Sequence, residues 1–237
     1  AMLATPVILK HQPAAIELMD KRLLALTENH IVHRRNRQWI EGSPEAVLAV
    51  EFFGRSDLEI HKKIKTLTAS LKTQKLGYAY PVISTADAIN VWAIRKAGLG
   101  LLMGVGQQKK PVAVIEDSAV APSDLFSYTK AISAIMAREK INCVYYGHAS
   151  VGLLHLRPEL DLAQSEDLLL FTALADEIAD LVKRFNGSLS GEHGDGRLRG
   201  PFLEKMVGAE LYDAHEDIKK AFDPDAIFNP GKILTKA

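Results

Sequence analysis

Two histidines on either side of a short glycine-containing segment are the first residues whose types and spacing suggest chemistry. His148 and His155 stand at positions 3 and 10 of the run Tyr-Gly-His-Ala-Ser-Val-Gly-Leu-Leu-His. If residues 149–154 form the turn of a hairpin, the two histidines become cross-strand partners with Cβ atoms about 5 Å apart. Two imidazoles at that distance can bind one ion at about 2.1 Å each. The simpler alternative is a pair of hairpin histidines with satisfied hydrogen bonds.

A second segment, residues 187–197, combines four glycines with charged residues in the run Gly-Ser-Leu-Ser-Gly-Glu-His-Gly-Asp-Gly-Arg. Such a density of glycine permits close approach of the backbone to a ligand. Glu192 and His193 are adjacent, so one can be a ligand and the other a proton acceptor. Two histidines and a glutamate form the ligand set of a catalytic zinc site with an open position, and Mn²⁺, Fe²⁺ or Co²⁺ also accept it. The alternative is a mobile loop whose charges are solvated.

Short β-rich runs alternate with amphipathic stretches, and these elements must position both segments. The apolar spacing predicts helices at 13–27, at 57–73, from Thr85 or Asp87 onward, and at 122–140, 165–185 and 209–222. Strands are predicted at 46–53, 80–83, 110–115, 143–146 and 153–156. Because 141–156 has the pattern of one hairpin, we expect an α+β fold with an antiparallel-rich sheet covered by helices, and not a doubly wound sheet.

The composition excludes several classes of protein. The 237 residues include 29 basic and 29 acidic side chains, so the chain lacks the positive charge of a general nucleic-acid binder. Its one cysteine, Cys143, has no intrachain partner and is expected to be a buried small hydrophobe in a reducing, cytoplasmic compartment. No apolar run is long enough for a membrane span, and no signal-peptide layout opens the chain. No Gly-x-Gly-x-x-Gly or Walker loop predicts nucleotide binding.

Three motifs make the chain similar to a known family. They are Gly147-His148-Ala-x-x-Gly152-x-Leu-His155, Ser190-Gly-Glu-His-Gly-Asp-Gly196, and Phe222-Asp-Pro followed by Asn229-Pro-Gly-Lys232. On these residues the chain resembles the C-terminal domain of FAD-linked oxidases and dehydrogenases of the vanillyl-alcohol-oxidase type, which act on D-2-hydroxy acids. Within that family it looks like the substrate and metal domain of bacterial FAD/iron–sulfur D-2-hydroxyglutarate or D-lactate dehydrogenases.

The resemblance implies that residues 1–237 are one domain excised from a longer chain. The FAD-binding domain of the family lies N-terminal to this domain, and nothing here resembles it, so the isolated chain is expected to be catalytically silent. An iron–sulfur cluster elsewhere in the full-length protein and a peripheral membrane association through the electron acceptor are compatible with the resemblance. The acceptor itself and the oligomeric state are left open.

The resemblance also implies a role for each candidate residue in oxidation of the 2-hydroxyl to a 2-oxo acid with hydride transfer to FAD. The metal, expected to be Zn²⁺, would be held by His148, His155 and Glu192 and would lower the pKa of the substrate hydroxyl. His193 would act as general base. Substrate would be bound by Arg95, whose guanidinium suits a carboxylate, and by Arg157, while Asn229 and Lys232 would face the cofactor.

The chain departs from the family pattern near the site. Ser150-Val-Gly-Leu153 replaces Gly-Asp-Gly-Asn between the histidines, so support for the ligands must come from elsewhere. A family lysine is replaced by Ile115 or Glu116, and a family asparagine by Arg157. An unpaired buried guanidinium is costly, so we expect Arg157 to pair with a second substrate carboxylate. This predicts a dicarboxylic acid such as D-2-hydroxyglutarate in preference to D-lactate. Further candidates for the second carboxylate are Arg197 and Arg199.

Two other functions are compatible with the same residues. In a metal-dependent hydrolase, the three ligands would hold a water that His193 activates, although no acid for a leaving group can be identified. In a non-catalytic binding or assembly domain, the histidine loops would be degenerate, and the altered segment between His148 and His155 is the best support for that alternative.

Overall fold

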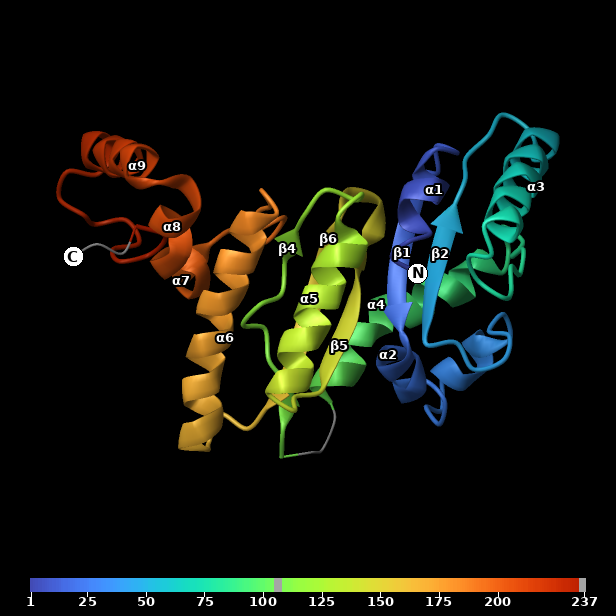
Figure 1. The fold of residues 1–237 in the computed structure, drawn as a ribbon, viewed down its shortest axis with the longest axis horizontal. Coiled ribbons are helices and arrows are strands. Elements are labelled where there is room, and N and C mark those ends of the chain that lie inside the picture. The colour runs from blue at the N-terminus through green and yellow to red at the C-terminus, as the bar shows by residue number, and fades with distance from the viewer. Residues whose placement is uncertain (105–107, 235–237) are drawn as a thin grey trace.

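The computed structural model describes residues 1–104 and 108–234 and confirms the α+β fold with an antiparallel sheet (Figure 1). The strands run in the order β2-β1-β5-β6-β3, and β4 also pairs with β6. Every pairing between these strands is antiparallel. Their bounds are β1 Ala15–Asp20, β2 Ala46–Glu51, β3 Lys110–Pro111, β4 Ser118–Ala119, β5 Cys143–His148 and β6 Leu153–Leu160.

The helices up to α6 cover the two faces of this sheet, and the helices after α6 form the C-terminal part of the chain. They are α1 Thr5–Leu9, α2 Lys21–Leu26, α3 Asp57–Thr73, α4 Ala88–Met103, α5 Leu125–Arg138, α6 Ser165–Arg184, α7 Gly196–Arg199, α8 Leu203–Val207 and α9 Ala209–Phe222. Short 3-10 turns are η1 His33–Arg37, η2 Ala149–Val151 and η3 Gly200–Phe202. The predicted helices at 57–73, 165–185 and 209–222 are confirmed to within one residue. The helix predicted from Thr85 or Asp87 onward is confirmed as α4, which begins at Ala88, and the one predicted at 122–140 is confirmed as the shorter α5. None of the described helices has the length and apolarity that a membrane crossing requires.

The predicted helix at 13–27 is wrong over its first part and is confirmed only over α2, Lys21–Leu26. Its first part is β1, which pairs with β2 on one side and with β5 on the other. Asp20 ends this strand and caps α2, because its Oδ1 accepts a hydrogen bond from the amide of Leu23 at 2.8 Å. Residues 16–19 are all buried, since both faces of the strand are covered. A strand covered on both faces lacks the alternation that distinguishes it from a helix.

Other differences concern short elements. Residues 80–83 form no strand, and only Lys110–Pro111 of the predicted strand 110–115 is paired as one. Pro111 has no amide hydrogen to continue a ladder, although the amide of Val112 still donates to the carbonyl of Pro158 at 2.8 Å. The pattern also did not predict α1, β4, α7 and α8, each of which has five residues or fewer. Elements of this length hold too few residues for a periodic signal.

Alternation along the strands divides the core in two. Side chains on one face join α1, α3, α5 and α6 in the larger cluster, which includes Leu18, Leu154 and Leu156. Side chains on the other face, Met19 and Val144 among them, join α2 and α4 in the smaller cluster. Figure 1 shows α5 in front of β5 and β6 and α4 passing behind the strands. Because side chains alternate between the two faces of a strand, the residues two positions before or after Met19 and Val144 also point to the α4 face.

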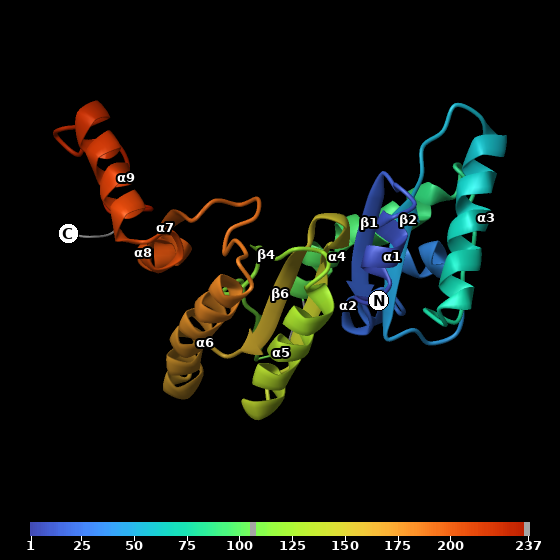
Figure 2. The same ribbon diagram turned by 45° about the horizontal axis from the view of Figure 1, so that its top comes forward.

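The C-terminal part leaves the body of the molecule. After α6 the chain turns back beside β4, where Ser188 forms an isolated bridge with Ala119. It then continues through α7 and α8 to α9, which lies at the far end from the strands in both views (Figures 1 and 2). The segment 188–193 is therefore held against the sheet, whereas the residues after α7 extend away from it.

Candidate active site

A cavity of about 550 Å³ lies between the α4 face of the sheet and α4 itself. Its sheet side is formed by Glu17 of β1, by Tyr146 and His148 of β5, and by His155 and Arg157 of β6. Helix α4 contributes Trp92, Arg95, Lys96 and Leu99, which recur at helical spacing on one side of the helix. Glu116, Glu192 and His193 complete the lining. Six of the predicted site residues are thus brought to one cavity: Arg95, His148, His155, Arg157, Glu192 and His193.

The register of the β5–β6 hairpin differs from the one expected. His155 pairs with Tyr146, and not with His148. The turn is shorter than predicted: η2 ends at Val151, Gly152 follows it with φ +74°, and β6 begins at Leu153. His148 lies two residues beyond Tyr146 on the same face, so the two histidines are diagonal neighbours. Their ring centroids are 5.4 Å apart, and the expected proximity of the rings is therefore confirmed despite the different pairing.

Glu17 links two of the predicted residues and was missed by the sequence analysis. It pairs directly with His148 across the β1–β5 ladder. Its Oε1 lies 2.6 Å from Nδ1 of His148, and its Oε2 accepts a hydrogen bond from Nε of Arg95 at 2.8 Å. The hydrogen bond between Glu17 and His148 raises the pKa of His148 above its usual value. Glu17 supplies the support that the altered segment 150–153 cannot give, and it fixes which nitrogen of His148 faces the cavity.

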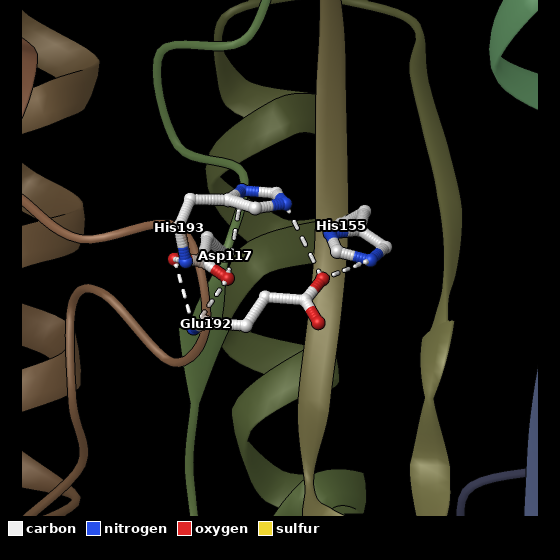
Figure 3. Close-up of side chains that lie close together, drawn as sticks. All are labelled: Asp117, His155, Glu192 and His193. Atoms are coloured by element: carbon white, nitrogen blue, oxygen red, sulfur yellow. Dashed lines mark hydrogen bonds and ion pairs between the residues drawn. The ribbon is translucent and has the colours of Figure 1, made fainter.

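Glu192 stands at the centre of three imidazoles. Its Oε1 is 3.3 Å from Nε2 of His155 and 3.3 Å from Nε2 of His193, as Figure 3 shows. The same oxygen is 3.6 Å from Nε2 of His148. The ring of His193 stacks on that of His155, with centroids 5.5 Å apart and an angle of 15° between the planes. The two loops singled out in the sequence therefore meet, although they lie on different elements.

Asp117 anchors the loop that carries Glu192 and His193, and the sequence analysis did not single it out. Its side chain is fully buried. It accepts hydrogen bonds from the amide of Glu192 at 3.0 Å, from the amide of His193 at 2.9 Å and from Oγ of Ser190 at 3.0 Å. Both oxygens are used in this way (Figure 3). Asp117 is thus a positioning residue for the loop.

The donor atoms fit a divalent metal ion. One donor atom each of Asp117, His155, Glu192 and His193 lie within 4.8 Å of one another, and His148 approaches the same glutamate oxygen. Burial, followed by the charge of His148, lowers the pKa of His155 to about 3. His155 is therefore neutral at physiological pH, the form in which an imidazole binds a metal. Asp117 accepts from two amides and from Oγ of Ser190, but a carboxylate has about four acceptor sites, so it can offer coordination beside the imidazoles and Glu192.

The two arginines of the cavity both have internal partners. Arg95 lies over the ring of Tyr146, with its guanidinium carbon 5.1 Å from the ring centroid, and bonds to Glu17. Arg157 donates through Nε to the hydroxyl of Tyr146 at 2.9 Å, and its Nη2 forms an ion pair with Oε2 of Glu116. The expectation that Arg157 lacks a partner within the protein is therefore wrong. Neither Glu116 nor Tyr146 carried a sequence signal for these contacts.

The remaining candidates lie outside the cavity lining. Arg199 donates to the carbonyl oxygens of Glu116 and Gly194, so it holds backbone together, and Arg197 is exposed. Asn229 and Lys232 are exposed in the segment after α9 and bond to each other at 3.1 Å. The role of Asn229 and Lys232 toward a flavin stays a prediction.

Comparison with known proteins gives the wider context. A family model described as FAD linked oxidases, C-terminal domain, matches residues 1–233. The chain is 32% identical to a D-2-hydroxyglutarate dehydrogenase of Haemophilus influenzae, over 99% of this chain and 24% of that protein. It is 27% identical to a D-lactate dehydrogenase of Anaerostipes hadrus, over 94% of this chain and 47% of that protein.

A solved structure shows the same fold. The 4-ethylphenol oxidase from Gulosibacter chungangensis, in complex with isoeugenol, superposes with a TM-score of 0.65 at 14% identity, over 98% of this chain and 50% of that chain. At that identity the likeness concerns the fold alone. The chain spans about a quarter to a half of the length of the proteins that it matches.

Proposed function

The chain belongs to the family of FAD linked oxidases, C-terminal domain, and on this premise we propose that it is the substrate- and metal-binding domain of an FAD-dependent D-2-hydroxy-acid dehydrogenase. The observation that carries the proposal is the group of three imidazoles around Glu192, in a cavity that also contains Arg95. The names of the relatives support the substrate class, because two of them are dehydrogenases of D-2-hydroxyglutarate and D-lactate. The FAD-binding domain would lie elsewhere in the full-length protein.

Each group of the cavity has a task in oxidation of a 2-hydroxy acid. His148, His155 and Glu192 would hold the divalent ion, with Zn²⁺ the expected one, and Glu17 keeps His148 oriented. Arg95 would bind the carboxylate of the substrate and thereby orient its α-carbon. When bound, the flavin accepts two electrons and the α-hydrogen, and the metal ion supplies a Lewis acid for the hydroxyl oxygen.

His193 would accept the hydroxyl proton at Nε2. Its Nδ1 lies 3.6 Å from Oδ1 of Asp117, so the carboxylate stabilises the positive charge that the ring acquires. The ring is 42% exposed, which allows the proton to pass on to water. Stacking against His155 and the hydrogen bonds of Asp117 to the loop backbone keep the ring in place.

The test uses the full-length protein that carries this chain, with bound flavin. We expect it to reduce an artificial dye with D-2-hydroxy acids and not with their L enantiomers. Replacement of His193 by Gln should lower kcat/KM by about 10²- to 10⁴-fold, the usual contribution of a general base, with unchanged metal and flavin content. Full turnover by His193→Gln would show that another group takes the proton. Failure to oxidise any 2-hydroxy acid would overturn the proposed reaction, and Zn²⁺-dependent ester hydrolysis would favour a hydrolase.

A further inference from the structure

The ion pair between Arg157 and Glu116 forms one wall of the cavity. The side chains are 7% and 14% exposed, so water screens the pair little. Arg157 stands on β6 two residues after His155, on the same face of the strand. Glu116 immediately precedes Asp117, which anchors the loop with Glu192 and His193. The position of both partners is therefore fixed by the same contacts that fix the metal-binding groups.

This pairing changes what Arg157 can bind. One of its nitrogens is in contact with the carboxylate of Glu116, and Nε donates to Tyr146. A second substrate carboxylate brought to Arg157 would meet the negative charge of Glu116 at close range in a poorly screened wall. Among the described residues of the cavity lining, the only lysine is Lys96, and it is exposed on α4, where water screens its charge.

The opposite wall favours an apolar group. Trp92 and Leu99 lie two turns apart on the cavity side of α4, with Arg95 between them. A substrate whose carboxylate is bound at Arg95 has apolar surface within reach on either side along the helix. Burial of a substrate side chain there would be favourable in proportion to its apolar area.

We propose that Glu116 determines specificity by occupying Arg157, so that the site takes D-2-hydroxy monocarboxylic acids with an apolar side chain and rejects dicarboxylic ones. The inference rests on the proposed function of the same site, and it reverses the preference for a diacid expected from the sequence. The reversal follows from Glu116, whose contact with Arg157 joins residues 41 positions apart and has no signature in the sequence.

The experiment compares acids of similar size in the full-length flavoprotein. The wild-type protein should oxidise D-2-hydroxybutyrate and D-2-hydroxyisocaproate with kcat/KM at least about tenfold above that for D-2-hydroxyglutarate. Glu116→Gln removes the negative charge and keeps an acceptor for Arg157, so the ratio of diacid to monoacid should rise by about tenfold or more. The ratio is the readout, because the absolute rates can change with the position of the loop.

Glu159→Gln is the matched control. Glu159 lies on β6, the strand that carries Arg157, and pairs with Arg22 outside the cavity lining. Its replacement should therefore leave the ratio of diacid to monoacid unchanged. A wild-type preference for the diacid, or an unchanged ratio in Glu116→Gln, would overturn the inference. The wild-type profile decides this even if the variant fails to fold.

A binding measurement separates the inference from the proposed function. Calorimetry with butyrate and glutarate as probes requires no turnover. If no 2-hydroxy acid is oxidised, the proposed reaction fails, but tighter binding of butyrate than of glutarate, reversed in Glu116→Gln, would still support Glu116 as the selective group. Equal binding of the two probes by wild type and variant would overturn that role.

Discussion

Glu17 joins a predicted substrate arginine to a predicted metal ligand, and the chemistry of the site depends on this carboxylate. Its two oxygens engage Arg95 and His148 separately, so one residue orients both groups. A carboxylate behind a ligating imidazole fixes the tautomer and increases the basicity of the ligand. The guanidinium of Arg95 is held by the other oxygen of Glu17 and lies over the ring of Tyr146. The geometry of two functional side chains is therefore set by one buried acidic residue.

Replacement of Glu17 by Gln should weaken Zn²⁺ binding by about 10- to 100-fold, the usual cost of losing an outer carboxylate. The reason is that an amide can no longer accept from His148 and Arg95 with a full negative charge. A competitive titration of zinc against a chromogenic chelator measures this. Glu45→Gln is the control, since Glu45 forms an exposed ion pair with Lys21. Equal zinc affinity in the two variants would contradict the role assigned to Glu17.

At the scale of elements, the sheet and the loop 188–193 position the site, and Asp20 and Gly152 are two residues on which that arrangement depends. Asp20 caps α2 and also accepts the amide of Tyr145 at 2.8 Å, so it joins β1, α2 and β5. Gly152 closes the β5–β6 turn, where a Cβ would lie 1.8 Å from the carbonyl oxygen of Val120. Both residues act on the hairpin that carries His148 and His155.

Asp20→Ala should lower the free energy of unfolding by about 2 kcal/mol, through loss of the cap and of one further hydrogen bond. Burial raises the pKa of Asp20, so the folded state holds the proton more tightly than the unfolded state does. The contribution from this shift is present below the unfolded pKa and is lost as pH rises through the folded pKa. The difference between wild type and variant should thus be larger near about pH 4 than at about pH 7.

Urea denaturation at both pH values measures this difference. Asp124→Ala is the matched control, because Asp124 stands at the same position before α5 but makes no capping hydrogen bond with its side chain. It should cost less than Asp20→Ala at either pH. A loss at Asp124 as large as that at Asp20 would mean that the side-chain bonds of Asp20 are not the cause.

Gly152→Ala should destabilise the protein by about 3 kcal/mol or more, because the residue has φ +74° and its new methyl group would collide with backbone. Gly100→Ala provides the contrast. Gly100 is exposed in α4 with no atom within 4 Å of the added Cβ, so the change should be neutral or stabilise by up to about 1 kcal/mol. Thermal unfolding followed by circular dichroism compares them. Similar melting temperatures for the two variants would contradict the close approach at Gly152.

The sequence predicts those elements whose signal is local. Long amphipathic helices such as α3 and α6 can be predicted from the periodicity of their apolar residues. The histidine and Gly-rich segments can be recognised from their residue types. The pattern of β1 predicts a helix, because the burial of this strand depends on partners about 30 and about 130 residues away. The contacts of Glu17, Glu116 and Asp117 also join segments far apart in the sequence, and no spacing rule reveals such pairs. These residues decide how the predicted ligands and arginines are held.

At the scale of the whole molecule, the sheet separates a larger core from the cavity. The larger cluster lies between the strands and α5 and α6, and it contains Cys143 of β5. Burial raises the pKa of the Cys143 thiol well above its usual range. The cavity lies on the other face with the smaller cluster. Chemistry is thus confined to one face, while the single thiol is enclosed on the opposite face.

Cys143 should therefore be inert in the folded protein. We expect its reaction with a disulfide reagent to be more than about 100-fold slower than in denaturant. A rise from about pH 7 to about pH 9 should accelerate the reaction of the unfolded chain, whose thiol titrates near about 8.5, and have little effect on the folded protein. Rapid labelling of the native protein at neutral pH would show that the core around β5 opens readily.

We propose that the imidazoles around Glu192 serve the oxidation of a D-2-hydroxy acid. The most direct measurement is anaerobic bleaching of the flavin in the full-length protein, mixed in a stopped-flow instrument with D- or L-2-hydroxybutyrate. We expect rapid bleaching by the D acid alone, and a rate lowered by about 10²-fold or more when His193 is replaced by Gln. Bleaching at the same rate in wild type and in His193→Gln, or no bleaching by any D-2-hydroxy acid in a protein loaded with zinc and flavin, would overturn this proposal.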